Sequence, residues 1–180
     1  MKEETKKNPQ WVHFGAGNIF RAFPAALQQK LLNEGIEKTG IIVAEGYDYE
    51  IIKKAYRPQD DLSLLVTLKA NGTIEKTVIG SLAESLTVDR HDAADWNRLK
   101  EIFASNTLQM VSFTITEKGY SITSPDGAFR ADVKADFEAG PENADSYIGK
   151  LAALCYWRYT QGAAPLALVS MDNCSHNGDK

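Results

Sequence analysis

The feature that most constrains this chain is a pair of closely spaced glycines, Gly15 and Gly17, between an apolar run and a helical pattern. The residues from Trp11 to Phe14 are typical of a short strand, and those after Phe20 have helical spacing. Gly15 permits a tight turn, and Gly17 lets a phosphate approach the main chain at the positive end of a helix. The segment therefore predicts a strand, a glycine turn and a helix that together hold a dinucleotide. The expected contacts are Gly15, Ala16, Gly17, Asn18, Ile19, Phe20 and Arg21.

Two residues of this segment depart from the simplest pattern. Phe20 stands where the general dinucleotide fingerprint has a third glycine, so the motif alone also fits an ordinary structural turn. Arg21 places a cation in the first helical turn, where it opposes the helix dipole unless an anion lies nearby. A cofactor diphosphate and a local carboxylate would each account for Arg21.

The next apolar run, from Gly40 to Glu45, predicts a buried parallel strand that ends on an acid. In dinucleotide-binding domains an acid at this place accepts hydrogen bonds from the adenosine ribose and disfavours a 2′-phosphate. We therefore expect Glu45 to contact the cofactor, with Asp48 as a competitor, and NAD to be favoured over NADP. The alternative for Glu45 is an exposed acid at a strand end.

The order of the remaining elements indicates the fold class. Residues 20 to 33 predict a helix with Pro24 in its first turn and an apolar face that includes Phe23 and Leu27. The sequence predicts an α/β fold with a Rossmann-like, doubly wound, mostly parallel sheet and an inserted β-hairpin. Residues 1–10 are predicted to form a polar tail, and residues 11–180 one dinucleotide-binding domain. The further elements expected are a short helix over 49–56, strands over 62–68 and 73–79 joined by a two-residue turn at Asn71-Gly72, a helix over 92–104, a strand over 108–115, a loop over 119–140, a helix that starts at Asp145 or Ser146 and ends at Gly162, and a strand over 165–170.

Charge and composition exclude several classes of partner. The formal net charge of −4 argues against nucleic acid and against an anionic membrane surface. No stretch approaches the roughly 20 apolar residues that cross a bilayer, and the charged start lacks the apolar core of a secretion signal. We therefore expect a cytoplasmic protein that binds a small molecule. The two cysteines and three histidines are scattered, so no metal site is expected.

Two further segments follow predicted strands and so belong at the same edge of the sheet. Thr116 and Glu117 lie where a strand runs out, and we expect them to contact ribose or nicotinamide unless they are plain solvent-facing loop residues. Asn173 follows the last apolar strand in a sequence rich in turn formers. Its spacing fits a turn, but an asparagine amide can also stabilise a developing oxyanion without ionising.

Together these segments resemble a known family, the polyol-specific long-chain dehydrogenases. This family includes mannitol 2-dehydrogenase, fructuronate reductase (mannonate oxidoreductase) and tagaturonate reductase. It tolerates an aromatic residue at the place of Phe20. The matching segments are HFGAGNIFR at 13–21, TITEKGY at 114–120, and SMDN at 170–173 with Asn177-Gly178.

The resemblance implies a Rossmann-type N-terminal domain followed by a mostly helical C-terminal domain, and a zinc-independent, NAD-dependent hydride transfer. The substrate implied is a polyol or sugar acid of the mannitol/fructose or mannonate/fructuronate type. The family's general acid/base lysine belongs to the C-terminal domain, beyond residue 180, so this fragment is expected to be inactive. Asn173 matches the family asparagine that polarises the reacting oxygen, and Met171 replaces a usual cysteine. A non-catalytic NAD-binding module is the alternative.

Overall fold

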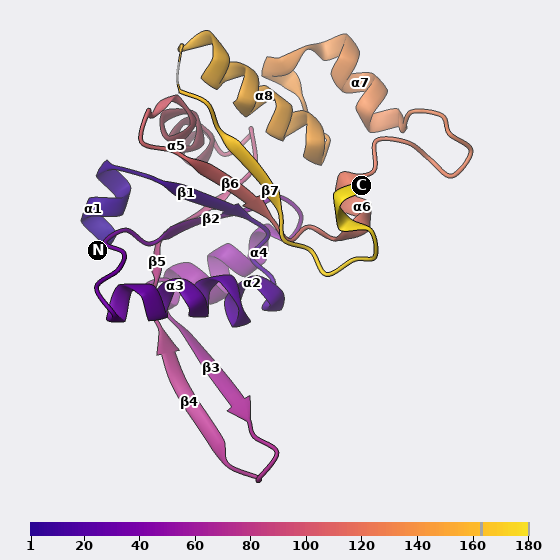
Figure 1. Cartoon of the computed structure of the whole chain (residues 1–180). Coiled ribbons are helices and arrows are strands. Elements are labelled where there is room, and N and C mark those ends of the chain that lie inside the picture. The colour runs from indigo at the N-terminus through magenta and orange to yellow at the C-terminus, as the bar shows by residue number, and fades with distance from the viewer. Residues whose placement is uncertain (163, 180) are drawn as a thin grey trace.

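The computed structural model describes residues 1–162 and 164–179, apart from the side chains of Glu117 and Lys118. A five-stranded parallel sheet in the order β5-β2-β1-β6-β7 forms its centre (Figure 1). The chain builds the sheet from β1 outward to β5, then returns to the other side of β1 for β6 and β7. This reversal is the doubly wound topology, and it confirms the predicted fold class. The strands are β1 (Trp11–Phe14), β2 (Ile41–Glu45), β5 (Leu82–Thr87), β6 (Met110–Phe113) and β7 (Ala167–Ser170).

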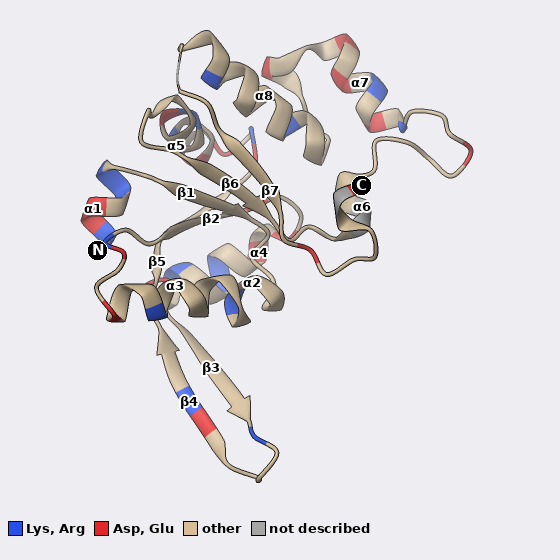
Figure 2. Cartoon of the chain, in the orientation of Figure 1, with Lys and Arg blue, Asp and Glu red and all other residues tan. Residues whose placement is uncertain are grey.

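Helices cover both faces of this sheet, with α2 and α3 on one side and α5 and α8 on the other (Figure 1). Ile41 and Val43 pack with Phe20 in one core cluster. Ile42 and Ala44 belong to the second cluster, which includes side chains of α5 and α8. Successive residues of a strand point to opposite faces, so β2 must be apolar throughout. Charged residues of both signs lie mainly on the helices and loops (Figure 2). The covering helices are α2 (Asn18–Ala22), α3 (Pro24–Asn33), α5 (Ala93–Ala104) and α8 (Tyr147–Thr160).

The single helix predicted over residues 20–33 is wrong in one respect, because the chain breaks at Phe23 into α2 and α3. Pro24 has no N–H group and occupies the first turn of α3, so it begins a helix instead of continuing one. The expected apolar face is also wrong. Phe23 and Leu27 are 64% and 63% exposed, while Ala25 and Gln28 are buried. The buried amide of Gln28 is satisfied by donating to the main-chain oxygen of Thr39.

The predicted hairpin is present as a separate two-stranded antiparallel sheet of β3 (Ser63–Leu68) and β4 (Ile74–Ile79). It projects away from the body of the molecule (Figure 1). Its turn is longer than the predicted two-residue turn, since Leu68 pairs with Ile74 and Lys69 bonds to Thr73 across the loop. Gly72 takes the left-handed conformation, at a φ of 82°, that ends this turn.

The structure contains elements that the sequence did not predict, among them a strand and a helix. β5 is a strand of mostly buried residues that mixes apolar and polar side chains without regular alternation, and it pairs with β2 at the edge of the sheet. The helix α7 (Ala131–Ala139) lies within the segment expected to be a loop. The predicted cap of α8 is confirmed at Ser146, whose hydroxyl accepts the N–H of Gly149 at 3.0 Å. The other elements are α4 (Tyr49–Ile51), a π-helical turn η1 (Ile52–Tyr56), α6 (Thr116–Tyr120), and the 3₁₀ turns η2 (Arg57–Gln59), η3 (Pro141–Asn143) and η4 (Asn177–Asp179).

The first residues differ from the expected polar tail, because Lys2–Lys7 form the helix α1. Thr5 of this helix is fully buried. Its hydroxyl oxygen accepts the N–H of Gly40, at 2.7 Å, just before β2 begins. Thr5 therefore ties this segment to the residue before β2, a polar contact that a search for apolar periodicity does not detect.

Within the described part of the chain, no helix is both long and apolar enough to span a membrane. The described residues also include no cluster of histidine, cysteine and acidic side chains suited to a metal ion.

Candidate functional site

The glycine turn between β1 and α2 lies at the carboxyl edge of the sheet, as predicted. Gly15 has a φ of 109°, a value that residues other than glycine rarely adopt. A Cβ atom at this position would also overlap the main-chain oxygen of Thr114 after β6. Gly15 donates its N–H to the oxygen of Ala44 at 2.9 Å, which fixes the turn against β2. Gly15 is therefore required by the fold itself.

Gly17 plays a different part, because its backbone is extended and any residue could adopt it. A Cβ atom added at Gly17 would meet no atom within 4 Å. No side chain caps the N-terminus of α2, and Asn18 and Ile19 in its first turn are exposed. The absence of a side chain at Gly17 therefore leaves open space beside uncapped helical N–H groups, which is the environment that an anionic group favours.

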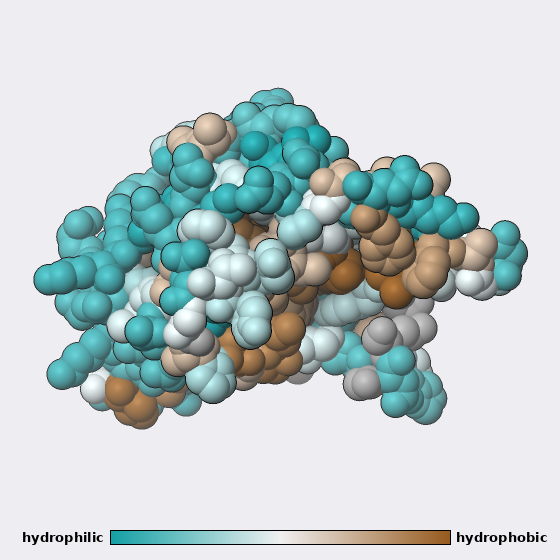
Figure 3. Space-filling view, turned by 90° about the horizontal axis from the view of Figure 1, so that it is seen from above, coloured by the Kyte–Doolittle hydropathy of each residue, from teal (hydrophilic) through white to brown (hydrophobic). Residues whose placement is uncertain are grey.

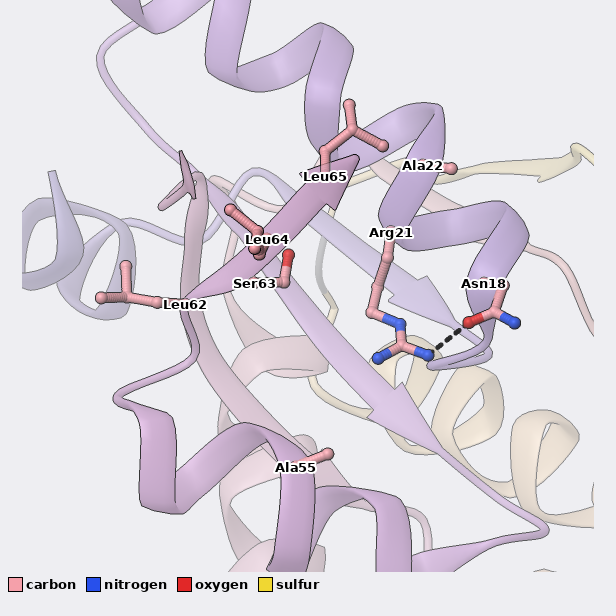
Figure 4. A pocket seen from close by; sticks show the side chains of 8 residues that line it. All are labelled: Asn18, Arg21, Ala22, Ala55, Leu62, Ser63, Leu64 and Leu65. Atoms are coloured by element: carbon pink, nitrogen blue, oxygen red, sulfur yellow. Dashed lines mark hydrogen bonds between the residues drawn. The ribbon is translucent and has the colours of Figure 1, made fainter. Parts of the chain in front are cut away.

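Arg21 lies in α2, beside this turn. Its guanidinium donates to the side-chain oxygen of Asn18 and stands 5.9 Å from the ring centre of Tyr56. No carboxylate among the described residues forms an ion pair with it, so the local salt bridge considered for Arg21 is not formed. Figure 4 shows Arg21 and Asn18 facing a cavity of about 410 Å³ between α2, η1 and the base of β3.

Phe20 occupies the position of the third glycine, and its side chain is fully buried. Its ring stacks on that of His13, with 4.1 Å between the ring centres. The two nitrogens of His13 lie 2.7 and 2.9 Å from the hydroxyls of Ser112 and Thr114 on the neighbouring segment. Burial lowers the pKa of His13 to about 3, so the ring is neutral. Phe20 thus supports the turn from inside the core, and the fully buried side chain leaves only its main chain for the predicted cofactor contact.

Glu45 ends β2 next to the glycine turn, where the sequence predicts it. It is buried, and its carboxylate accepts the N–H groups of Ala16 at 2.7 Å, Tyr47 at 2.8 Å and Asp48 at 3.3 Å. Asp48 is exposed and accepts the N–H of Glu50 at the start of α4. Glu45 is therefore not the exposed strand-end acid of the alternative interpretation, because it is buried and holds main-chain groups together, while Asp48 caps α4.

The segment after β6 is held by a residue that sequence reasoning did not single out. Asp172, which follows β7, accepts the N–H groups of Ile115 and Thr116 at 3.0 and 3.2 Å. Thr116 is exposed and has a φ of 64°, an unusual value for a β-branched residue. The side chain of Glu117, also predicted to bind the cofactor, lies outside the described residues. The signal for Asp172 was available, since it is an acid placed directly after an apolar strand.

Asn173 is exposed at the carboxyl end of β7, on the same edge of the sheet as the glycine turn. Together with Met171 it borders a hollow of about 560 Å³. The rest of this hollow is mostly apolar and includes Ile19, Phe23 and Leu27 of the α2–α3 segment. The structure thus brings Asn173 and the first turn of α2 to one surface, although β6 separates their strands.

A second cleft opens on the α8 side of the same edge and was not predicted. It has a volume of about 230 Å³, and its lining includes Gly46, Tyr47, Tyr147 and Lys150. The Tyr147 ring stacks on Tyr47 and occupies the space that a Cβ atom at Gly46 would need. Its hydroxyl is buried with no hydrogen-bond partner among the described residues. Lys150 is also buried and donates to the hydroxyl of Tyr49 at 3.0 Å. Burial lowers the pKa of Lys150.

A doubly wound sheet with a glycine turn at its topological switch point defines a Rossmann-type nucleotide-binding domain. The chain belongs to the family described as the mannitol dehydrogenase Rossmann domain, whose model matches residues 9–180.

Individual relatives agree with this assignment. The chain is 49% identical to a D-mannonate oxidoreductase of Thermotoga maritima, over 100% of this chain and 33% of that protein. It is 31% identical to a polyol:NADP oxidoreductase of Gluconobacter oxydans, over 95% of this chain and 35% of the relative. A solved ternary complex of Pseudomonas fluorescens mannitol 2-dehydrogenase with NAD and D-mannitol has a TM-score of 0.77 and 30% identity, over 94% of this chain and 35% of that one. The chain spans about a third of the length of these relatives.

Proposed function

We propose that this chain is the NAD-binding part of an oxidoreductase that transfers hydride between nicotinamide and a polyol or sugar acid. The observation that carries the proposal is Gly17, which leaves open space beside the uncapped N-terminus of α2. A diphosphate fits this place because helical N–H groups and the guanidinium of Arg21, which pairs with no carboxylate among the described residues, favour negative charge. Gly15 supports the proposal indirectly, since it brings this turn against the segment after β6.

The other parts of NAD have candidate sites along the same edge. The cleft beside Tyr47 holds the unpartnered hydroxyl of Tyr147 and suits the adenosine half. The segment with Thr116 and Glu117 is the candidate for the nicotinamide half, because it lies at the carboxyl end of β6. Bound NAD would supply the hydride acceptor, and this chain would bind and orient it. We favour NAD over NADP because Asp48, the exposed acid of the loop after β2, makes this edge unfavourable for a 2′-phosphate.

The proposed substrate is of the mannitol/fructose or mannonate/fructuronate type. Support comes from the D-mannonate oxidoreductase relative and from Asn173, whose exposed amide can polarise a carbonyl or alkoxide oxygen. We infer that a helical C-terminal domain provides the general acid/base and most substrate contacts, since the chain spans about a third of its relatives. We place the protein in the cytoplasm, where its two unpaired cysteines would stay reduced.

Calorimetric titration of the 180-residue chain with NADH tests cofactor binding. We expect saturable binding without turnover of mannitol or mannonate, because oxidation of an alcohol needs a base to remove its proton. No heat of binding at millimolar NADH would overturn the proposal.

A second experiment separates an enzyme from a non-catalytic NAD-binding module. A longer chain that continues the native sequence past Lys180 would be screened with NAD against mannitol, mannonate, altronate and arabinitol. Reduction of NAD with at least one of them is expected, whereas NADH binding without any turnover by the longer chain would favour the module.

A further inference from the structure

The main chain of Ala16, between the two glycines of the turn, is held by two buried side chains. Its N–H donates to Oε2 of Glu45 at 2.7 Å, and its carbonyl oxygen accepts the hydroxyl of Tyr56 at 2.8 Å. Glu45 is 7% exposed and Tyr56 is 3% exposed. Glu45 comes from the end of β2 and Tyr56 from the π-helical turn η1, so two separate elements fix the two peptide groups on either side of the Ala16 Cα atom.

The second carboxylate oxygen of Glu45 binds the main chain of the loop between β2 and α4. Oε1 accepts the N–H groups of Tyr47 and Asp48, so the carboxylate joins the β2–α4 loop to the glycine turn. A buried carboxylate is stable only when hydrogen bonds or a cation compensate its lost hydration. Here three main-chain N–H groups do so, and no cation among the described residues pairs with Glu45.

We propose that Glu45 and Tyr56 are positioning residues that preset the glycine turn for the cofactor diphosphate, and that Glu45 does not read the ribose. This inference rests on the proposed NAD binding. With both carboxylate oxygens bonded to the main chain and little surface exposed, Glu45 has no free face for ribose hydroxyls. Glu45 affects NAD binding only by holding the main chain of Ala16 in place. It therefore influences the affinity for the diphosphate and leaves the choice between NAD and NADP unchanged.

A set of single-atom changes tests this role. Glu45→Gln keeps the shape of the side chain but turns one acceptor oxygen into a donor, and Tyr56→Phe removes only the hydroxyl. Glu50→Gln is the matched control, because Glu50 is an exposed acid on α4 whose side chain pairs with Lys54. Dissociation constants would be measured for NADH, NADPH and adenosine, with circular dichroism to confirm that each variant is folded.

For folded Glu45→Gln we expect NADH and NADPH to bind about tenfold more weakly by the same factor, with adenosine affinity unchanged. Tyr56→Phe should give a smaller loss of the same kind, and Glu50→Gln none. A ribose-reading Glu45 would instead make Glu45→Gln lose NADH selectively and weaken adenosine, which would overturn the inference. If Glu45→Gln does not fold, Tyr56→Phe decides, and unchanged NADH affinity in that variant would refute the positioning role. Failure of the unmodified chain to bind NADH would count against the proposed function instead.

Discussion

The hydroxyl of Tyr120 donates a hydrogen bond to Oδ2 of Asp172 across 2.6 Å, joining the segment after β6 to the segment after β7. Burial raises the pKa of Tyr120, so this donor keeps its proton at neutral pH. Asp172 also holds the N–H groups of Ile115 and Thr116. The arrangement parallels that of Glu45, since in both places a buried acid organises the main chain at the carboxyl edge of the sheet.

Asp172→Ala should therefore destabilise the fold. The change leaves buried N–H groups without an acceptor, which costs about 2 kcal/mol of the free energy of unfolding. Urea titration followed by tryptophan fluorescence would measure it. Asp179→Asn is the control, because the Asp179 side chain is 83% exposed and should change the free energy little. Equal stability of both variants would show that the contacts of Asp172 contribute nothing.

The two glycines of the turn should respond in opposite ways to alanine. Gly15→Ala should lower the free energy of unfolding by more than about 2 kcal/mol, because its φ is strained for alanine and its Cβ overlaps Thr114. Gly17→Ala should cost under about 1 kcal/mol yet weaken NADH binding, since its methyl group enters the open space beside α2. Calorimetric titration and urea unfolding of both variants separate the effects, and unchanged NADH affinity in Gly17→Ala would argue against a diphosphate there.

The stability of the chain should decrease in acid through His13. Burial lowers its pKa from 6.5 to about 3, so the unfolded chain binds this proton first as the pH falls. Above about pH 6.5 the neutral ring costs nothing, and between about 6.5 and 3 the free energy of unfolding drops by up to about 1.4 kcal/mol per pH unit. Urea midpoints from pH 7.5 to 5.5 should fall less steeply in His13→Asn than in the unmodified chain. His91→Asn, at an exposed site, should retain the full slope.

Arg158→Lys should be strongly destabilising although the charge is conserved. Arg158 is 4% exposed, and its guanidinium donates to the main-chain oxygens of Phe103, Ser105, Leu108 and Ala164. A lysine ammonium is a point donor and cannot span these four oxygens, so we expect a loss of about 2–3 kcal/mol. Thermal unfolding would be measured for Arg158→Lys and for the control Arg90→Lys, because the partner of Arg90, Asp145, is exposed. A similar, small effect in both would contradict the prediction.

Exposed apolar surface should make the 180-residue chain self-associate. Phe23 and Leu27 border the hollow at Asn173, and further apolar patches interrupt the mostly hydrophilic surface seen from above (Figure 3). Changing both residues to serine should lower the sedimentation coefficient at high concentration. The same change at Leu68 and Ile74 of the hairpin should have less effect if the hollow dominates. A monodisperse monomer for the unmodified chain would refute the prediction.

Features set by local sequence were predicted from it. The glycine turn follows from Gly15 and Gly17, and the hairpin from two β-rich runs around Asn71-Gly72. The start of α5 is also local, since Asp92 accepts the N–H of Asp95. In each case the residues that determine the conformation are close neighbours in the chain.

Features set by distant partners were not predicted. β5 carries Glu84, Ser85 and Thr87, which do not form an apolar run. The structure satisfies them through Arg98, Asp61 and Asp95, contacts that no local pattern reveals. The same reason applies to Glu45. Its position at the strand end was predicted correctly, but the direction of its carboxylate depends on the N–H of Ala16, which is far from it in sequence.

The projecting hairpin has a practical consequence for protein engineering. Because Ser63 and Ile79 are paired neighbours, the ribbon leaves the body and returns to it at nearly one point. The part of the hairpin beyond the Val66–Lys76 pair is not paired with any strand of the parallel sheet. It can therefore be shortened or replaced by a reporter peptide with little loop-closure cost. The chain thus carries a natural insertion point in the outer part of the hairpin, while the base of the hairpin, which borders the Arg21 cavity, is left unchanged.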